Sequence, residues 1–128
     1  MKQYCTGVQH VGLPTNDLDK TIDFYTALGF EIALQTVNKQ AGERVAFLRL
    51  GNLTVESYEN HNAAGHSGAW DHVALDVTDV EAIFRLMKEK GYTSPNQQIE
   101  FLPFWENGVR FFTITGPNGE KVEFSQYL

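Results

Sequence analysis

The sequence predicts an α+β protein made of two βαβββ modules, and an internal repeat is the main observation behind this prediction. The stretch from His10 to Phe30 reads HVGLPTNDLDKTIDFYTALGF, and the stretch from His72 to Tyr92 reads HVALDVTDVEAIFRLMKEKGY. The two align without a gap. Each begins with the alternation of a strand, continues with apolar residues at helical spacing, and ends at a glycine. The repeat therefore predicts one domain over residues 1–128, with halves at 7–60 and 69–128.

In the first half we expect a strand over residues 7–13, with His10 on the face opposite the apolar side chains. Asn16 or Asp17 can accept hydrogen bonds from the free N–H groups that open the following helix. Gly29 can end this helix because it tolerates a positive φ. The apolar stripe of the helix comprises Leu18, Ile22, Tyr25 and Leu28. Three strands are expected next, at Phe30–Val37, Arg44–Leu50 and Asn52–Tyr58.

The segment 61–68, HNAAGHSG, is small and polar, which predicts a linker in which His61 and His66 are solvated. The second half repeats the plan, and its elements are expected at Trp70–Val77 (strand), Val80–Lys90 (helix), within Tyr92–Phe101 (strand), Val109–Thr115 (strand) and Lys121–Gln126 (strand). A Gly-Pro-Asn-Gly turn joins the last two strands. Just before these two strands, residues 101–108 read FLPFWENG. This segment predicts an aromatic loop that walls a pocket, or else a satellite hydrophobic cluster.

Charge and composition narrow the functional class. The formal net charge is −6 and the ten basic residues are scattered, which argues against a nucleic-acid partner. No stretch approaches the ~20 apolar residues of a membrane span, and the start of the chain lacks the apolar core of a signal peptide. The one cysteine, Cys5, cannot form an internal disulfide and is interpreted as structural. These observations predict a cytoplasmic protein.

Four polar residues stand out because the strand alternation puts them on the faces that the helices do not cover. They are His10, Glu56, His72 and Glu123, one His and one Glu in each half. If the two halves curl into one mixed sheet, this face becomes a concave cup. Two imidazoles and two carboxylates facing one another there would need a divalent metal, which imidazole and carboxylate ligands suit. The alternative is that each is a satisfied or solvated residue, as we expect for Glu59 and Glu120.

These residues carry a resemblance to the vicinal-oxygen-chelate superfamily, which includes glyoxalases, bleomycin-resistance proteins and dioxygenases. The pattern is most similar to bacterial glyoxalase I, or lactoylglutathione lyase. The matching pieces are DFY in the first helix, TVESYEN around Glu56, DHVALDV around His72 and GPNGEKVEFSQ around Glu123. They extend over essentially the whole chain. The related fosfomycin-resistance enzymes and extradiol dioxygenases use two His and one Glu, so Glu56 separates this chain from them.

The resemblance implies a metal-dependent lyase or isomerase that acts on a vicinal-oxygen substrate, such as the hemithioacetal of a 2-oxoaldehyde and a thiol. A divalent metal (Ni, Co or Zn) would be held by His10, Glu56, His72 and Glu123 and would act as a Lewis acid. Glu123 would be the main proton carrier, with Glu56 as its partner. The resemblance also implies a small-molecule substrate and a homodimer.

The sequence departs from the glutathione-using members at one position. The glutathione-using members resemble one another in carrying an Arg four residues after the first metal ligand. This chain has Pro14 at that position, and a proline cannot pair with a glutathione carboxylate. Asn60 matches the family's glutathione-contacting Asn, so the use of glutathione stays open. A substitute anion contact could come from any of three arginines: Arg44, Arg49 and Arg110.

Two alternatives differ in class from the lyase. One is a metal enzyme of the same fold with another reaction, namely an epimerase, a dioxygenase or a thiol transferase. The other is a metal-free protein that binds a small drug in a cup lined by Trp70, Phe104 and Trp105. The four-ligand set argues against this second alternative, because a binding cup has no need of it.

Overall fold

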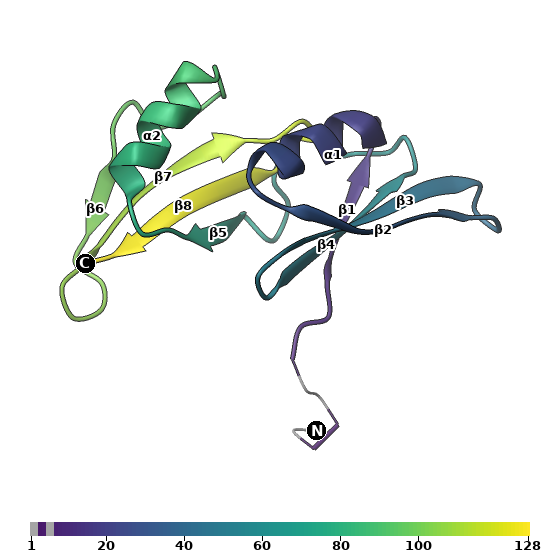
Figure 1. The fold of residues 1–128 in the computed structure, drawn as a ribbon, viewed down its shortest axis with the longest axis horizontal. Helices are drawn as coiled ribbons and strands as arrows, with labels where there is room; N and C mark the ends of the chain where they lie inside the picture. Colours follow the sequence, from purple (N-terminus) through teal and green to yellow (C-terminus); the bar gives the residue numbers. More distant parts are fainter. Residues whose placement is uncertain (1–2, 5–6) are drawn as a thin grey trace. The chain divides into compact units, whose positions relative to one another are not determined.

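The structure is a computed structural model that describes residues 3–4 and 7–128, so the interpretation of Cys5 lies outside the described residues. The chain divides into two compact units, Met1–Ala64 and Gly65–Leu128 (Figure 1).

The first unit holds a four-stranded mixed sheet covered on one face by a helix (Figure 1). The strand order is β1-β4-β3-β2, with β1 parallel to β4 and the other pairs antiparallel. Helix α1 packs against the strands of this sheet, chiefly β3 and β4. The elements are β1 (Val11–Thr15), α1 (Leu18–Ala27), β2 (Glu31–Asn38), β3 (Glu43–Leu50) and β4 (Leu53–Glu59).

The second unit repeats this topology, with strand order β5-β8-β7-β6 and α2 packed on β7 and β8. As β1 runs parallel to β4 in the first unit, β5 runs parallel to β8 in the second. The elements are β5 (His72–Asp76), α2 (Val80–Glu89), β6 (Glu100–Leu102), β7 (Val109–Thr115) and β8 (Lys121–Tyr127). The predicted α+β class with two βαβββ modules is therefore confirmed, and the sheets are mixed and not closed into a barrel.

Some predicted boundaries are wrong. The first strand begins at Val11 and not at Gly7, so His10 lies just before the ladder. The sixth strand has only three residues, Glu100–Leu102, and reaches into the segment that was predicted to be a loop. Pairing with β7 extends it, which local sequence patterns do not reveal.

Both helices begin in the same way. Asp17 accepts a hydrogen bond from Lys20 N at 3.0 Å, and Asp79 accepts one from Ala82 N at 2.9 Å. Of the two caps expected for the first helix, Asp17 is therefore the one used. The first N–H groups of a helix have no partner within the helix, and these side chains satisfy one such group in each helix.

A second contact ties each helix start to the last strand of its sheet. Leu18 N donates to Oε2 of Glu59 at 2.7 Å, and Val80 N donates to Oε1 of Gln126 at 2.9 Å. Glu59 and Gln126 each lie three residues after the Glu of the candidate site. The prediction that Glu59 is solvated is wrong, because its side chain is 15% exposed and accepts this bond.

The apolar core of each unit lies between helix and sheet. In the first unit Leu18 and Ile22 of α1 lie with Leu48 and Val55 among the buried residues. In the second, Phe112 is fully buried and stacks on Phe124 at 5.0 Å between ring centroids. The opposite face of each sheet carries no helix of its own unit. It is the face on which the candidate site residues lie.

Glu120 was also predicted to be solvated, and this too is wrong. Its Oε2 accepts a bond from Asn118 N at 3.0 Å, while Oε1 is buried without a hydrogen-bond partner. The side chain folds over Gly116, where a Cβ would meet Oε1. Burial raises the pKa of this carboxyl above its ordinary value, opposed by hydrogen bonds from the backbone of Glu120 and Asn118.

Among the described residues, neither helix combines the length and the apolar character needed to cross a bilayer.

Candidate functional site

The first His–Glu pair lies at the end of the parallel ladder between β1 and β4. Gly12 pairs with Glu56 in this ladder, and His10 lies two residues before Gly12, on the same face. Nε2 of His10 is 2.9 Å from Oε2 of Glu56. The His10 ring also meets the edge of Phe47, with 5.9 Å between ring centroids. The fold thus brings together two residues that are far apart in sequence.

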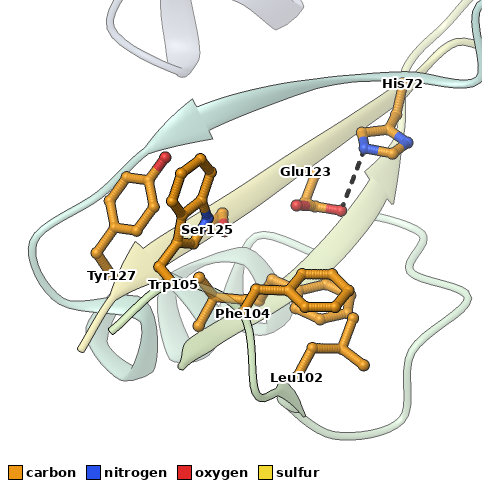
Figure 2. Close-up of a pocket in the computed structure, with 9 residues that line it drawn as sticks. His72, Leu102, Phe104, Trp105, Glu123, Ser125 and Tyr127 are labelled. Atoms are coloured by element: carbon orange, nitrogen blue, oxygen red, sulfur yellow. Dashed lines mark ion pairs between the residues drawn. The ribbon is translucent and has the colours of Figure 1, made fainter. Parts of the chain in front are cut away.

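The second pair has the same register. Ala74 pairs with Glu123 in the ladder between β5 and β8, and His72 lies two residues before Ala74. Nε2 of His72 is 3.5 Å from Oε2 of Glu123 (Figure 2). Both pairs are partly exposed, with side-chain exposures of 32% and 28% for His10 and Glu56 and of 41% and 15% for His72 and Glu123. The internal repeat therefore extends to the geometry of the site.

The residue before each His contacts the other ring nitrogen. Nδ1 of His10 is 3.0 Å from Oε1 of Gln9, and Nδ1 of His72 is 2.9 Å from Oδ2 of Asp71. Asp71 also receives a hydrogen bond from Nζ of Lys121 at 2.9 Å. The hydrogen bond from His72, then that from Lys121, holds the pKa of Asp71 below its ordinary value. Asp71 is therefore an acceptor, and His72 donates to it through Nδ1–H.

This arrangement places acceptors at both ring nitrogens of His72. A neutral imidazole carries one N–H, so the Nε2 lone pair then faces a carboxylate oxygen of Glu123. Two lone pairs facing each other require a second proton or a cation between them. Gln9 differs from Asp71, because an amide can present either oxygen or NH₂ to His10 and so does not fix the tautomer.

The two pairs fit the ligand chemistry of a divalent metal. Metal–ligand bonds of about 2.0–2.2 Å at right angles place two ligand atoms about 3 Å apart. The N–O distances of 2.9 and 3.5 Å lie near this spacing. Each unit supplies two such ligands, while no group of three or more potential His, Cys, Asp or Glu ligands occurs within residues 3–4 and 7–128.

A pocket of about 350 Å³ adjoins the second pair (Figure 2). Burial raises the pKa of Glu123, opposed by the charge of His72 and reinforced by Asp71. Of the two alternatives for residues 101–108, the pocket wall is the one that the structure supports. Trp70 is 87% exposed and does not line the pocket. The lining consists of His72, Leu102, Phe104, Trp105, Val109, Phe111, Glu123, Ser125 and Tyr127.

Other residues singled out in the sequence have local partners. Oδ1 of Asn60 accepts a bond from Asn62 N at 2.9 Å, within its own loop. Pro14 lies in β1, opposite Tyr58 at the edge of the sheet, where a missing N–H is tolerated. His61 and His66 are exposed, as expected for linker residues.

The three arginines differ in the partners that their side chains contact. Arg44 contacts Asp19 at 2.6 Å, and Arg110 contacts Glu81 at 2.8 Å. The side chain of Arg49 donates to the hydroxyl of Thr54 at 3.3 Å and has no carboxylate partner among the described residues. By strand alternation Arg49 shares the face of Phe47 and Glu56.

Sequence reasoning missed Asp71 and Gln9, and it missed Ser125 and Tyr127 in the pocket. A signal for all four was present. Asp71 and Gln9 occupy equivalent positions in the repeat, and Ser125 and Tyr127 follow Glu123 with the period of two that puts strand residues on one face.

A family model for the Glyoxalase/Bleomycin resistance protein/Dioxygenase superfamily matches residues 7–124. The chain belongs to this superfamily. Among curated relatives, the uncharacterized protein YwbC of Bacillus subtilis is 29% identical over 126 residues, covering 93% of this chain and 96% of that protein. A probable lactoylglutathione lyase of Vibrio cholerae is 31% identical over 97 residues, which are 66% of each chain.

Solved structures of the superfamily share the fold. The trypanothione-dependent glyoxalase I of Leishmania major superposes with a TM-score of 0.78 at 22% identity, covering 95% of this chain and 87% of that one. The fosfomycin resistance protein FosX of Listeria monocytogenes, in complex with Mn(II) and sulfate, gives a TM-score of 0.75 at 16% identity, covering 97% and 94%.

Proposed function

We propose that this protein is a metal-dependent lyase of glyoxalase I type, acting on a vicinal-oxygen substrate such as a 2-oxoaldehyde–thiol hemithioacetal. His10, Glu56, His72 and Glu123 would hold one divalent ion, Ni, Co or Zn. The observation that carries the proposal is the repeated geometry, in which the Nε2 of each His faces the carboxylate of a Glu. The acceptor at Nδ1 of His72 leaves the Nε2 lone pair available for a metal.

The bound metal would supply Lewis-acid chemistry, stabilising negative charge that develops on the two vicinal oxygens. The protein's own contribution is proton transfer. Glu123 would take the proton from the carbon that bears the hydroxyl and return it to the neighbouring carbon, so that the substrate is isomerised without net gain or loss of atoms. The burial that raises the pKa of Glu123 makes this carboxylate a stronger proton acceptor. Glu56 would be its partner.

Two comparisons support this proposal, and one observation supports the runner-up. The Vibrio cholerae relative is a probable lactoylglutathione lyase, and FosX was solved with Mn(II). The aromatic pocket beside His72 also suits a drug-binding protein of the same fold. We favour the enzyme because binding alone does not require two matched His–Glu pairs.

Glutathione is expected to be a poor thiol. Pro14 shares a strand face with Gly12 and His10 and brings no charge to it. A charge-assisted contact to a carboxylate is worth roughly 1.5–3 kcal/mol, or about ten- to a hundred-fold in binding. Asn60 remains a candidate contact for a thiol cofactor. Arg49 is the best-placed substitute for the missing Arg, because Arg44 and Arg110 already pair with carboxylates.

The test is steady-state kinetics on the glutathione–methylglyoxal adduct, and on adducts of other thiols, with Ni-, Co- and Zn-loaded protein. We expect isomerisation that is weak for the glutathione adduct and lost in Glu123→Gln. Efficient turnover of the glutathione adduct would refute the specificity claim while keeping the lyase. No turnover of any 2-oxoaldehyde adduct would favour an epimerase, a dioxygenase or a thiol transferase.

A further inference from the structure

The pocket beside His72 and Glu123 divides into a polar end and an aromatic end. Glu123, Ser125 and Tyr127 follow one another at alternate positions of β8, so they line one face of the strand. At ~3.3 Å per residue, the Cα positions of Glu123 and Tyr127 are about 13 Å apart along the strand. Figure 2 shows His72 and Glu123 at one end of the pocket and Trp105 with Tyr127 at the other.

The aromatic walls are exposed to an extent that folding alone does not explain. Trp105 is 75% exposed, Tyr127 60% and Phe104 54%, although these side chains would be stabilised by burial. The rings of Trp105 and Tyr127 meet edge to face, with centroids 5.7 Å apart. Their arrangement leaves aromatic surface open to the pocket.

Backbone strain supports the same interpretation. Trp105 has φ of +63°, a left-handed conformation that bulky residues rarely adopt. Strained residues persist when surrounding contacts hold them, and they concentrate at ligand sites. The contacts here join the loop to the end of the chain: Nδ2 of Asn107 donates to Leu128 O, and Leu128 N donates to Gly108 O, each at 3.1 Å. The ring of Phe101 lies where a Cβ on Gly108 would be, so this position requires glycine.

The charges of the pocket limit what it can take. No Lys or Arg is among the residues that line it, and Glu123 is its one carboxylate. A carboxylate on the ligand would therefore find no Lys or Arg side chain to pair with at the aromatic end of the pocket. A volume of about 350 Å³ lies at the small end of ligand pockets.

We propose that the pocket takes a neutral aromatic group, and that the substrate carries this group next to its vicinal oxygens. Trp105 and Tyr127 are then specificity-determining residues: they hold the ring while the oxygens lie at the His72–Glu123 end. The inference rests on the proposed function only for the placement of the oxygens. The aromatic subsite itself follows from the lining.

A matched pair of small probes tests this proposal by calorimetry. 2-Hydroxyacetophenone and hydroxyacetone are both neutral, both carry adjacent carbonyl and hydroxyl oxygens, and differ by phenyl against methyl. We expect the phenyl probe to bind the full chain at least ~10-fold more tightly, from the apolar area and ring contacts that it adds. In Trp105→Ala and in Tyr127→Ala the ratio should fall to within about two-fold. Trp70→Ala, which removes another largely exposed tryptophan that lies outside the pocket, should keep this ratio.

Equal binding of the two probes by the wild-type chain would overturn the proposal. An unchanged ratio of the two probe affinities in Trp105→Ala and Tyr127→Ala would overturn it as well. If the molecular mass of these variants in solution shifts at the same time, the aromatic end serves self-association instead. Thermal unfolding identifies a variant that has lost its fold, and Trp105→Phe is a milder substitution that should keep an intermediate ratio.

Titrations with and without Ni(II) separate the aromatic subsite from the proposed metal enzyme. A phenyl preference without any metal uptake supports the subsite and refutes the metal enzyme. Metal uptake without a phenyl preference does the reverse.

Discussion

Oδ2 of Asp71 lies 2.9 Å from Nδ1 of His72, whereas the equivalent position before His10 holds the neutral Gln9. A carboxylate at one ring nitrogen fixes the tautomer of a histidine and makes the other ring nitrogen a stronger metal ligand. An amide has a weaker effect. Lys121 steadies Asp71 through a second contact at 2.9 Å. The two halves of the repeat are therefore alike in geometry but unequal in charge, with the carboxylate-paired imidazole beside the pocket.

Asp71→Ala should weaken metal binding by about 10–100-fold, the usual cost of losing a partner of a metal-binding His. Asp71→Asn keeps an acceptor without the charge and should lie between. Isothermal titration with Ni(II) or Zn(II) measures this, and ¹⁵N shifts of the His72 ring report the tautomer independently. Gln9→Ala is the matched control and should cost less. Wild-type affinity in Asp71→Ala would show that the contact has no role in the site.

His72→Ala should abolish stable metal binding and leave the fold largely intact. Half-exposed His72 begins the outer strand of its sheet, and the buried core beneath it, around Phe112, does not include it. Metal analysis of protein reconstituted with Ni or Zn and then desalted gives the readout, with circular dichroism as the check on folding. The exposed linker residue gives the control, His66→Ala. Stoichiometric metal in His72→Ala, or none in the wild-type chain, would contradict the proposed site.

Glu59→Ala should destabilise the protein by roughly 1–3 kcal/mol, because it leaves the buried N–H of Leu18 without its acceptor. Urea unfolding followed by circular dichroism measures the change. Glu59→Gln is the matched control, since the second unit uses Gln126 in the same place. It should retain most of the stability. An equal loss in both variants would instead assign the effect to the charge and its contact with Arg44, at 3.6 Å.

Glu120→Gln should stabilise the protein near neutral pH and do little in acid. Burial raises the pKa of Glu120 in the folded state above its ordinary 4.5, so folding favours the protonated form. The contribution of this group is fully present below the unfolded-state pKa and is lost as the pH rises through the folded-state pKa. The free energy of unfolding of Glu120→Gln minus that of the wild type should therefore grow as the pH rises from about 4.5 toward neutrality. A difference that is constant over this range would refute the assignment.

A homodimer is expected, and strand β2 is the surface that we would test. It is an edge strand on which Ile32, Leu34 and Val37 are 45%, 52% and 53% exposed. Apolar edge strands readily pair with another chain. Light scattering should give twice the chain mass of 14.4 kDa, and Leu34→Lys should reduce it. Leu86→Lys, at a similarly exposed leucine on α2, is the control. A species of single-chain mass at micromolar concentration would contradict the dimer.

Much of the fold and of the candidate site could be predicted because the information is local and occurs twice. Helical spacing, a capping Asp and a terminal Gly appear in both halves, so each half supports the interpretation of the other. Strand alternation alone places His10, Glu56, His72 and Glu123 on the faces away from the helices. The composition of residues 101–108 left a pocket wall and a satellite hydrophobic cluster open, and the structure favours the pocket wall.

The errors have a common physical cause. Glu59 and Glu120 are charged residues near strand ends, and composition favours solvation for them. The structure buries both: Glu59 meets a helix start that is distant in sequence, and Glu120 folds over a glycine in its own turn. The short strand Glu100–Leu102 likewise exists because β7 offers it a partner, and not because of its own residues.

Periodicity and residue type were enough to predict the class of fold, the repeat, and the two His–Glu pairs. Which atoms meet depends on how distant segments pair in the folded chain. The ladder register puts each His diagonal to its Glu. Only after that placement does the residue before His72 become an acceptor at Nδ1, and only then do Trp105 and Tyr127 form the aromatic end of a pocket. Long-range pairing fixes these relations, and no local pattern encodes it.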